Sequence, residues 1–174
     1  IQYAVEEALQ AGAEKLVFVT GSAKRAIEDH FDPDHELEQE LATKGREHTL
    51  NSLRGIVPSY ASCIFIRQPY PLGLGHAVLC SRPAVGHEPF FVHLADDLID
   101  AEEACLGQMA RVFERHGGSV LGVQTVKPEE TDKYGIVEAD AVDAQVSRIR
   151  RIGEKPTPKD APSTLAVVGR YVLT

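Results

Sequence analysis

Apolar runs alternate with amphipathic stretches along most of the chain. Four runs are apolar enough to form buried strands, at residues 16–20, 63–68, 89–95 and 120–126. Apolar positions at helical spacing predict helices over residues 1–12, 41–58 and 102–116. Two shorter helices are expected, one capped by Ser22 and one that begins at Gly75. Strands that alternate with helices indicate βαβ units and a mostly parallel or mixed sheet flanked by helices.

The pattern changes after residue 126. Residues 135–138, 146–152 and 165–173 read as strands with no long helix between them. We therefore expect an α/β fold with an antiparallel β extension in its later part. The alternating α/β portion covers about residues 1–126, and the β-rich portion covers about residues 127–174.

The composition is that of an ordinary globular domain. The chain has 174 residues, of which 43% are hydrophobic and 25% are charged, and this balance excludes a disordered tail, a collagen-like chain and a coiled coil. Eighteen basic and 26 acidic side chains give a net charge of -8, which argues against binding to nucleic acid.

The cysteines and the hydropathy of the chain indicate the cellular compartment of the protein. No run approaches the roughly 18 apolar residues of a membrane span, and the first residues do not have the form of a signal peptide. Three widely spaced cysteines, an odd number, are typical of free thiols in a reducing compartment. We expect a cytoplasmic protein with no membrane partner.

Polar residues stand where three of the predicted strands end. Ligands of open α/β sheets bind at the carboxyl ends of the strands. The first end carries Gln68 and a loop with Gly73 and Gly75, where backbone can approach a ligand closely. The amide of Gln68 has a donor and an acceptor, which suits the edge of a base. The alternative is a tight turn with no ligand.

The other two ends carry charged groups. Asp96 and Asp97 follow the third strand, and a carboxylate there suits Mg²⁺. Their alternative role is to cap the next helix or to form a turn. Glu154 and Lys155 follow the strand at 146–152 and suit sugar hydroxyls and a phosphate, respectively. The alternative for this pair is a surface ion pair.

Other chemistries find no support in the sequence. The seven histidines are scattered without the spacing of zinc ligands. Neither a P-loop nor a G-x-S-x-G motif occurs.

Taken together, these stretches resemble one family over nearly the whole chain. The matching segments, in order, are Val19–Thr20, Lys24–Asp32, Arg67–Gln68, Gly73–Ala77, Leu94–Asp97, Lys133–Val137, Glu154–Pro156 and Gly169–Leu173. The chain resembles the bacterial UTP–glucose-1-phosphate uridylyltransferases, and the run at 24–32 is the most specific single match.

The resemblance implies a fold, a reaction and its substrates. The fold is a Rossmann-like nucleotidyltransferase domain, which residues 1–174 represent as a single, incomplete domain. The reaction is the Mg²⁺-dependent transfer of UMP from UTP to glucose 1-phosphate, which yields UDP-glucose and pyrophosphate.

The resemblance also assigns roles to residues. It implies that Gln68 and Gly75 contact the uracil. It implies that Asp96 binds the metal and lies near the ribose and phosphates. It places Gly135, Glu154 and Lys155 on the sugar-phosphate side, with Asp96 and Lys155 as the catalytic groups.

Two segments of the family are absent from the 174 residues. One is a Gly-rich loop with Arg and Lys that holds the triphosphate, and the other is a later segment with a further metal-ligating Asp. We therefore expect this chain to be the central portion of the enzyme and to turn over poorly alone. The open alternatives are a related thymidylyl-type transferase, an inactive paralogue that binds nucleotide-sugar, and an interaction domain. The sequence also leaves homo-oligomerisation open.

Overall fold

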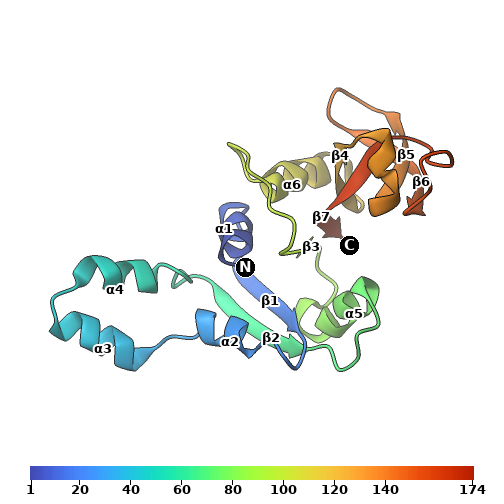
Figure 1. The fold of residues 1–174 in the computed structure, drawn as a ribbon. Helices are drawn as coiled ribbons and strands as arrows, with labels where there is room; N and C mark the ends of the chain where they lie inside the picture. Colours follow the sequence, from blue (N-terminus) through green and yellow to red (C-terminus); the bar gives the residue numbers. More distant parts are fainter. The chain divides into compact units, whose positions relative to one another are not determined.

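In the computed structural model, which describes residues 1–174, the first two apolar runs form a parallel pair of strands (Figure 1). Strand β1 (Lys15–Thr20) pairs with β2 (Ser62–Arg67) in unbroken register, from Lys15 opposite Ser62 to Thr20 opposite Arg67. A parallel pair requires a crossover, and here three helices supply it. The predicted βαβ arrangement is confirmed for this part of the chain.

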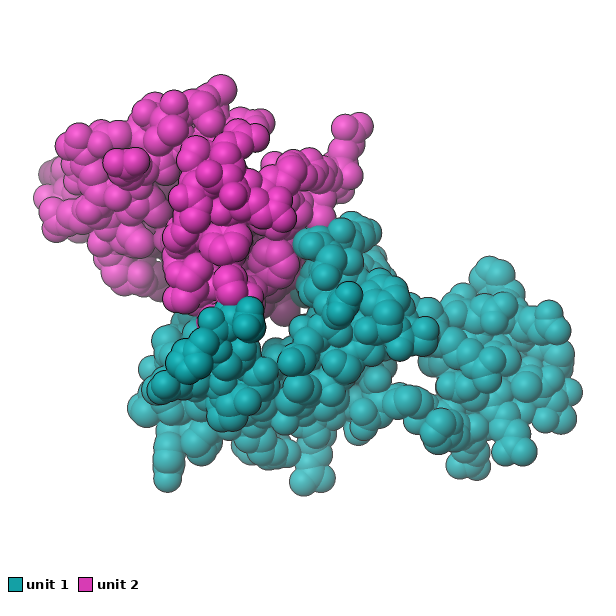
Figure 2. Space-filling view, turned by 180° about the vertical axis from the view of Figure 1, so that it is seen from behind, with its two compact units in different colours: residues 1–88 teal, residues 89–174 magenta.

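The chain divides into two compact units, residues 1–88 (unit 1) and residues 89–174 (unit 2), which Figure 2 colours teal and magenta. Unit 1 holds the parallel pair and five helices: α1 (Gln2–Gln10), α2 (Arg25–Phe31), α3 (His35–Thr43), α4 (Glu47–Arg54) and α5 (Leu74–Val85). Helix α5 packs against both strands.

The core of unit 1 joins its first helix to the sheet. Val5, Leu16 and Phe31 are buried together, and partly buried apolar side chains pack against them. Phe18 of β1 stacks on Phe31 at 4.8 Å and on Phe65 of β2 at 5.1 Å between ring centroids. Such aromatic contacts add to the burial of apolar surface, so they fix α2 against the two strands.

The long helix expected at residues 41–58 is divided differently in the structure. Helix α3 already runs through residue 43, and Gly45, with φ +65°, turns the chain before α4 begins at Glu47. A glycine adopts this left-handed conformation without steric cost, which explains the break. Figure 1 shows α3 and α4 side by side, with Leu41 and Leu50 buried.

The predicted cap at Ser22 is wrong. Helix α2 begins at Arg25 with Lys24 as its N-cap residue, and no side chain caps it. Asp34 is the residue that caps a helix in this region, because its Oδ1 accepts from the amide of Leu37 at 2.9 Å.

Unit 2 is built around one long central strand. Its elements are β3 (Phe90–His93), α6 (Cys105–His116), β4 (Val120–Thr125), a 3₁₀ helix η1 (Pro128–Lys133), β5 (Gly135–Ala141), β6 (Ser147–Glu154) and β7 (Leu165–Leu173). Strand β7 pairs antiparallel with β3, β4 and β5, and β6 pairs antiparallel with β5. The antiparallel extension predicted for the later residues is confirmed.

The third and fourth predicted strands run in the same direction but do not pair with each other. Both are antiparallel to β7, which lies between them: Tyr171 is opposite Val92 of β3 and also opposite Leu121 of β4. Helix α6 therefore makes a βαβ crossover whose two parallel strands have an antiparallel strand inserted between them. The α/β fold class is confirmed, and the sheet of unit 2 contains only antiparallel pairs.

The cysteines and the lengths of the helices bear on the expected compartment. All three cysteines are free, as predicted, and each is half-buried. None of the helices combines the length and the apolar character needed to cross a bilayer.

Candidate functional site

Gln68 is the first residue beyond β2. Its backbone amide donates to the carbonyl of Thr20 at 2.9 Å and so extends the pairing of β1 and β2 by one step. The side-chain Nε2 donates to the carbonyl of Gly73 at 3.1 Å and lies 3.1 Å from Nδ1 of His76. The loop after the strand is therefore folded back, with the Gln68 amide fixed against the start of α5.

The glycines of this loop leave the start of α5 open. Gly73 has φ +91° and is the N-cap residue of the helix, and the first intrahelical bond runs from the amide of Ala77 to its carbonyl. Gly75 is exposed, and a Cβ added to it would meet no heavy atom within 4 Å. The amides of the first turn have no intrahelical partner, so a ligand can reach them there.

The two adjacent carboxylates after β3 have different surroundings. Asp97 is half-buried, and its Oδ2 accepts from the amide of Gly169 at 2.9 Å. Asp96 is exposed and forms no hydrogen bond or ion pair within the chain. Neither caps α6, which begins at Cys105 with Ala104 as its N-cap residue, so the capping alternative is wrong. The turn alternative holds for Asp96, which lies in a turn with the residue before it. Asp97 anchors the loop, and Asp96 is left available to a ligand.

A buried arginine holds this loop in place. Arg170 of β7 has no exposed surface, and its guanidinium donates to the carbonyls of Leu94 at 3.2 Å and of Asp97 at 2.7 Å. The loop between those two residues is thereby fixed at both ends. Sequence reasoning missed this role, although a charged residue inside the apolar run at 165–173 was a usable signal, because buried charges need partners.

The neighbouring glycine is required by close packing. A Cβ added to Gly169 would lie 2.5 Å from Cβ of Leu94 and 3.1 Å from Oδ2 of Asp97. Its carbonyl accepts from the amide of Leu94 at 2.8 Å, which continues the pairing of β3 and β7. The loop that carries Asp96 can lie this close to β7 only because residue 169 has no side chain.

Glu154 and Gly135 are opposite one another where β5 begins and β6 ends. Oε2 of Glu154 lies 3.7 Å from the point where a Cβ of Gly135 would stand. Lys155 follows with φ +43°, the one non-glycine residue of the chain in this region, and its amide donates to the carbonyl of Tyr134 at 3.0 Å. Strained backbone of this kind is held by its surroundings and concentrates at functional sites.

The ion-pair alternative for Glu154 and Lys155 is wrong. Both side chains are exposed, and neither forms an ion pair or side-chain hydrogen bond within the chain. Their charges are therefore available to a ligand.

The phenol of Tyr171 is affected by carboxylates at the end of β3 and at the end of β6. Burial raises the pKa of Tyr171 above its ordinary value near 10, and the charges of Asp97 and Glu154 raise it further. Both carboxylates disfavour the phenolate, so both act on the same group of β7. Unit 2 thus brings together the residues after β3 and those at the end of β6.

The predicted site residues are divided between the two units. Gln68 and Gly75 belong to unit 1, whereas Asp96, Gly135, Glu154 and Lys155 belong to unit 2. No group of three or more His, Cys, Asp or Glu side chains stands close enough together to hold a metal ion, so the chain offers single carboxylates rather than a cage.

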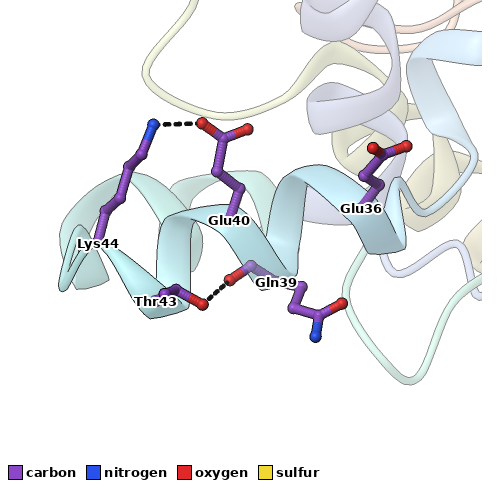
Figure 3. Close-up of a pocket in the computed structure, with 5 residues that line it drawn as sticks. All are labelled: Glu36, Gln39, Glu40, Thr43 and Lys44. Carbon is purple, nitrogen blue, oxygen red and sulfur yellow. Dashed lines mark hydrogen bonds and ion pairs between the residues drawn. The ribbon is translucent and has the colours of Figure 1, made fainter.

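A hollow elsewhere in unit 1 carries none of these residues. It has a volume of about 280 Å³ and lies along α3, lined by Glu36, Gln39, Glu40, Thr43 and Lys44 (Figure 3). Figure 3 shows that all five residues belong to α3 or to its C-terminal end, and that Lys44 pairs with Glu40. An open hollow lined only by polar side chains of a single helix and its end lacks the apolar side chains that line a typical ligand site.

The strands and helices define an α/β domain with parallel and antiparallel strand pairs, and the comparison with known families shows which family it belongs to. The chain belongs to the nucleotidyl transferase family, whose model matches residues 1–174. Among curated proteins, the chain is 47% identical over 173 residues to the UTP–glucose-1-phosphate uridylyltransferase YngB of Bacillus subtilis. That match covers 99% of this chain and 58% of the relative, so the chain spans less than two thirds of the relative's length.

Solved structures give the same result. A UTP-bound UDP-glucose pyrophosphorylase from Acinetobacter baumannii matches with a TM-score of 0.91 and 40% identity, over 99% of this chain and 62% of that one. A UDP-glucose pyrophosphorylase complexed with UDP-glucose matches with a TM-score of 0.87 and 40% identity, over 99% and 63% of the two chains. The predicted family and the predicted nucleotidyltransferase fold are confirmed.

Proposed function

We propose that this chain is the central portion of an enzyme that transfers UMP from UTP to glucose 1-phosphate. The products are UDP-glucose and pyrophosphate. The observation that supports the proposal most is that three exposed charged groups at the strand ends have no partner in the chain. They are the carboxylates of Asp96 and Glu154 and the ammonium of Lys155. The relatives that are named for this reaction match almost the whole chain.

Asp96 is the proposed metal ligand. Mg²⁺ binds proteins through one or two carboxylates and takes its remaining ligands from water and phosphate. The exposed carboxylate of Asp96 has no partner in the chain and sits on a loop fixed by Arg170, so the residues present fit such an ion. When bound, Mg²⁺ would neutralise charge that develops on the phosphates.

Glu154, Lys155 and Gly135 form the proposed sugar-phosphate side. The carboxylate of Glu154 accepts hydrogen bonds from sugar hydroxyls, and the ammonium of Lys155 pairs with phosphate oxygens. Gly135 leaves the space beside the Glu154 carboxylate free of a side chain. The positive φ of Lys155 fixes the direction in which its side chain leaves the strand end.

Gln68 and Gly75 form the proposed base-binding side. The Gln68 amide is held against the start of α5, and the open backbone at Gly75 gives a base access to the first turn of the helix. Together they offer side-chain and main-chain hydrogen bonds to a flat ring.

The reaction needs no covalent intermediate on the protein. An oxygen of glucose 1-phosphate attacks the α-phosphorus of UTP in line, a new P–O bond forms, and pyrophosphate leaves. The chain's contribution is to hold the two substrates in attacking geometry and to stabilise negative charge with Lys155. The triphosphate itself needs a Gly-rich loop outside these residues, so we propose that the 174 residues alone turn over poorly. The three free thiols suit a cytoplasmic location.

The test is pyrophosphate release by the complete protein that carries this chain. Release is measured with UTP, glucose 1-phosphate and Mg²⁺, and then with other nucleotides and sugar phosphates. Asp96→Asn and Lys155→Met are compared with Asp100→Asn and Lys159→Met, which change exposed residues of the same type nearby in the sequence. We expect losses of roughly 100-fold or more in kcat for the first pair, since each removes charge stabilisation at the reacting phosphates.

The control pair should retain near-normal kcat. Release that is equally strong in Asp96→Asn and in the parent protein would contradict the role of Asp96. A folded protein that releases no pyrophosphate with any pair of substrates would contradict the proposed function as a whole.

A further inference from the structure

The side-chain amide of Gln68 contacts two groups, the carbonyl of Gly73 and the imidazole of His76. The carbonyl of Gly73 only accepts hydrogen bonds, so the group that faces it at 3.1 Å is the NH₂ of Gln68. The same nitrogen lies 3.1 Å from Nδ1 of His76. An amide nitrogen has no lone pair to offer, so Nδ1 is the acceptor and the imidazole carries its proton on Nε2. Sγ of Cys80 lies 3.9 Å from Nε2 and 4.0 Å from Nδ1, so the sulfur does not distinguish the two ring nitrogens and the Gln68 amide decides the assignment.

These contacts use both N–H groups of the amide. Gly73 takes one and His76 takes the other, which leaves Oε1 of Gln68 without a partner in the chain. A side chain that has both a donor and an acceptor is thereby reduced to an acceptor for any ligand. If the amide rotated by 180°, its oxygen would face two acceptors and both hydrogen bonds would be lost.

We propose that His76 is a positioning residue that fixes the polarity of the Gln68 amide, and so selects bases whose ring nitrogen carries a proton. Uracil has such an N–H in its ring at neutral pH, whereas the corresponding nitrogen of cytosine is an acceptor. An Oε1 without a partner in the chain therefore pairs with uracil and repels cytosine. Thymine shares the N–H, so this device separates uracil from cytosine and does not separate it from thymine. The assignment rests on the proposed function for the identity of the ligand.

The first experiment compares substrates in the complete protein. The ratio of kcat/KM for UTP to kcat/KM for CTP is measured for the parent protein, His76→Ala, His76→Asn and His87→Ala. Asn offers an acceptor oxygen close to the position of Nδ1, and His87 is an exposed histidine just after α5. We expect the ratio to fall roughly fivefold in His76→Ala, because one of the two bonds that set the amide's orientation is lost. The ratio should be near the parent value in the other two variants.

A structural role alone would not change this ratio. If His76 only supported the fold, both kcat/KM values would fall together, and this result would overturn the proposal. So would an unchanged ratio in His76→Ala. If that variant does not fold, His76→Leu keeps most of the volume without an acceptor and is expected to show the same loss of discrimination.

The second experiment does not depend on activity. Long-range ¹H–¹⁵N spectra of the complete, ligand-free protein identify which ring nitrogen of His76 carries the proton. The proposal requires a proton on Nε2 and an unprotonated Nδ1. It also requires the NH₂ signals of Gln68 to shift in His76→Ala but not in His87→Ala. A proton on Nδ1 would overturn the proposal. A parent protein that uses neither UTP nor CTP would instead count against the proposed function, and the spectra would still decide the role of His76.

Discussion

At the scale of single residues, two neighbours on β7 determine how Asp96 is presented. Arg170 ties the carbonyls of Leu94 and Asp97, and Gly169 lets the loop approach the strand. Asp97 completes the arrangement by accepting from the Gly169 amide. None of these groups needs to touch a substrate, yet each restricts where the Asp96 carboxylate lies. A carboxylate that is held in place in this way loses less conformational entropy when it binds an ion.

Gly169→Ala tests this packing directly. The added methyl group would stand 2.5 Å from Cβ of Leu94, which is attached to backbone and cannot rotate away. We expect the free energy of unfolding to fall by about 1–3 kcal/mol, as for other overpacked sites. The measurement is urea denaturation of the complete protein.

Gly21→Ala is the matched control, since a Cβ there would meet nothing within 4 Å. It should change the free energy of unfolding by less than the substitution at Gly169. Equal effects of the two substitutions would contradict the close contact between β7 and the loop.

At the scale of elements, β7 organises unit 2 by pairing with three strands. Its residues Tyr171 and Val172 have partners in both β3 and β4, so the strand is enclosed on both edges. The pKa of Tyr171 is also raised by carboxylates at two different strand ends, those of Asp97 and Glu154. Its titration therefore reports whether the ends of β3 and β6 lie near each other in solution.

The Tyr171 phenol should release its proton late in an alkaline titration. Burial and the charges of Asp97 and Glu154 raise its pKa above 10 in the folded protein, whereas the unfolded chain titrates near 10. Its contribution to stability is complete below pH 10 and is lost as the pH rises through the higher folded pKa. Ultraviolet difference spectra of the parent protein and Tyr171→Phe isolate this phenol among the five tyrosines.

Neutralising either carboxylate should move that titration back toward its ordinary range. Asp97→Asn and Glu154→Gln each remove one charge that disfavours the phenolate, whereas Glu129→Gln changes an exposed acid of η1 that does not act on Tyr171. A Tyr171 titration that is unaffected by both of the first two variants would contradict the proximity of the two strand ends.

The elements show which features are local enough to be predicted from sequence. The strands β1 to β4 were predictable because each contains a continuous apolar run, and their ends were predictable because polar residues interrupt those runs. The insertion of β7 between β3 and β4 was not, because its pairs join residues far apart in the chain, such as His93 and Arg170. The residue pattern alone did not separate Asp96 from Asp97, and only the resemblance assigned the metal to Asp96. The fold decides which carboxylate meets a backbone amide, and that carboxylate is Asp97.

At the scale of the whole molecule, the chain contains two units, and the predicted site residues occur in both of them. Unit 1 carries the proposed base-binding residues, and unit 2 carries the proposed metal and sugar-phosphate residues. The membership of the nucleotidyl transferase family covers both units, because its model matches residues 1–174. The proposed reaction moves the α-phosphorus of UTP to glucose 1-phosphate. Its most direct test therefore follows that phosphorus in the complete protein.

That test is the fate of label from UTP in the complete protein. With glucose 1-phosphate and Mg²⁺ present, we predict that ³²P from the α-position of UTP appears in UDP-glucose, while ³²P from the γ-position appears in pyrophosphate. Asp96→Asn should slow both transfers together. Label from the α-position that appears only in UMP would indicate hydrolysis, and label that stays in UTP would indicate binding without transfer. Either result would contradict uridylyl transfer.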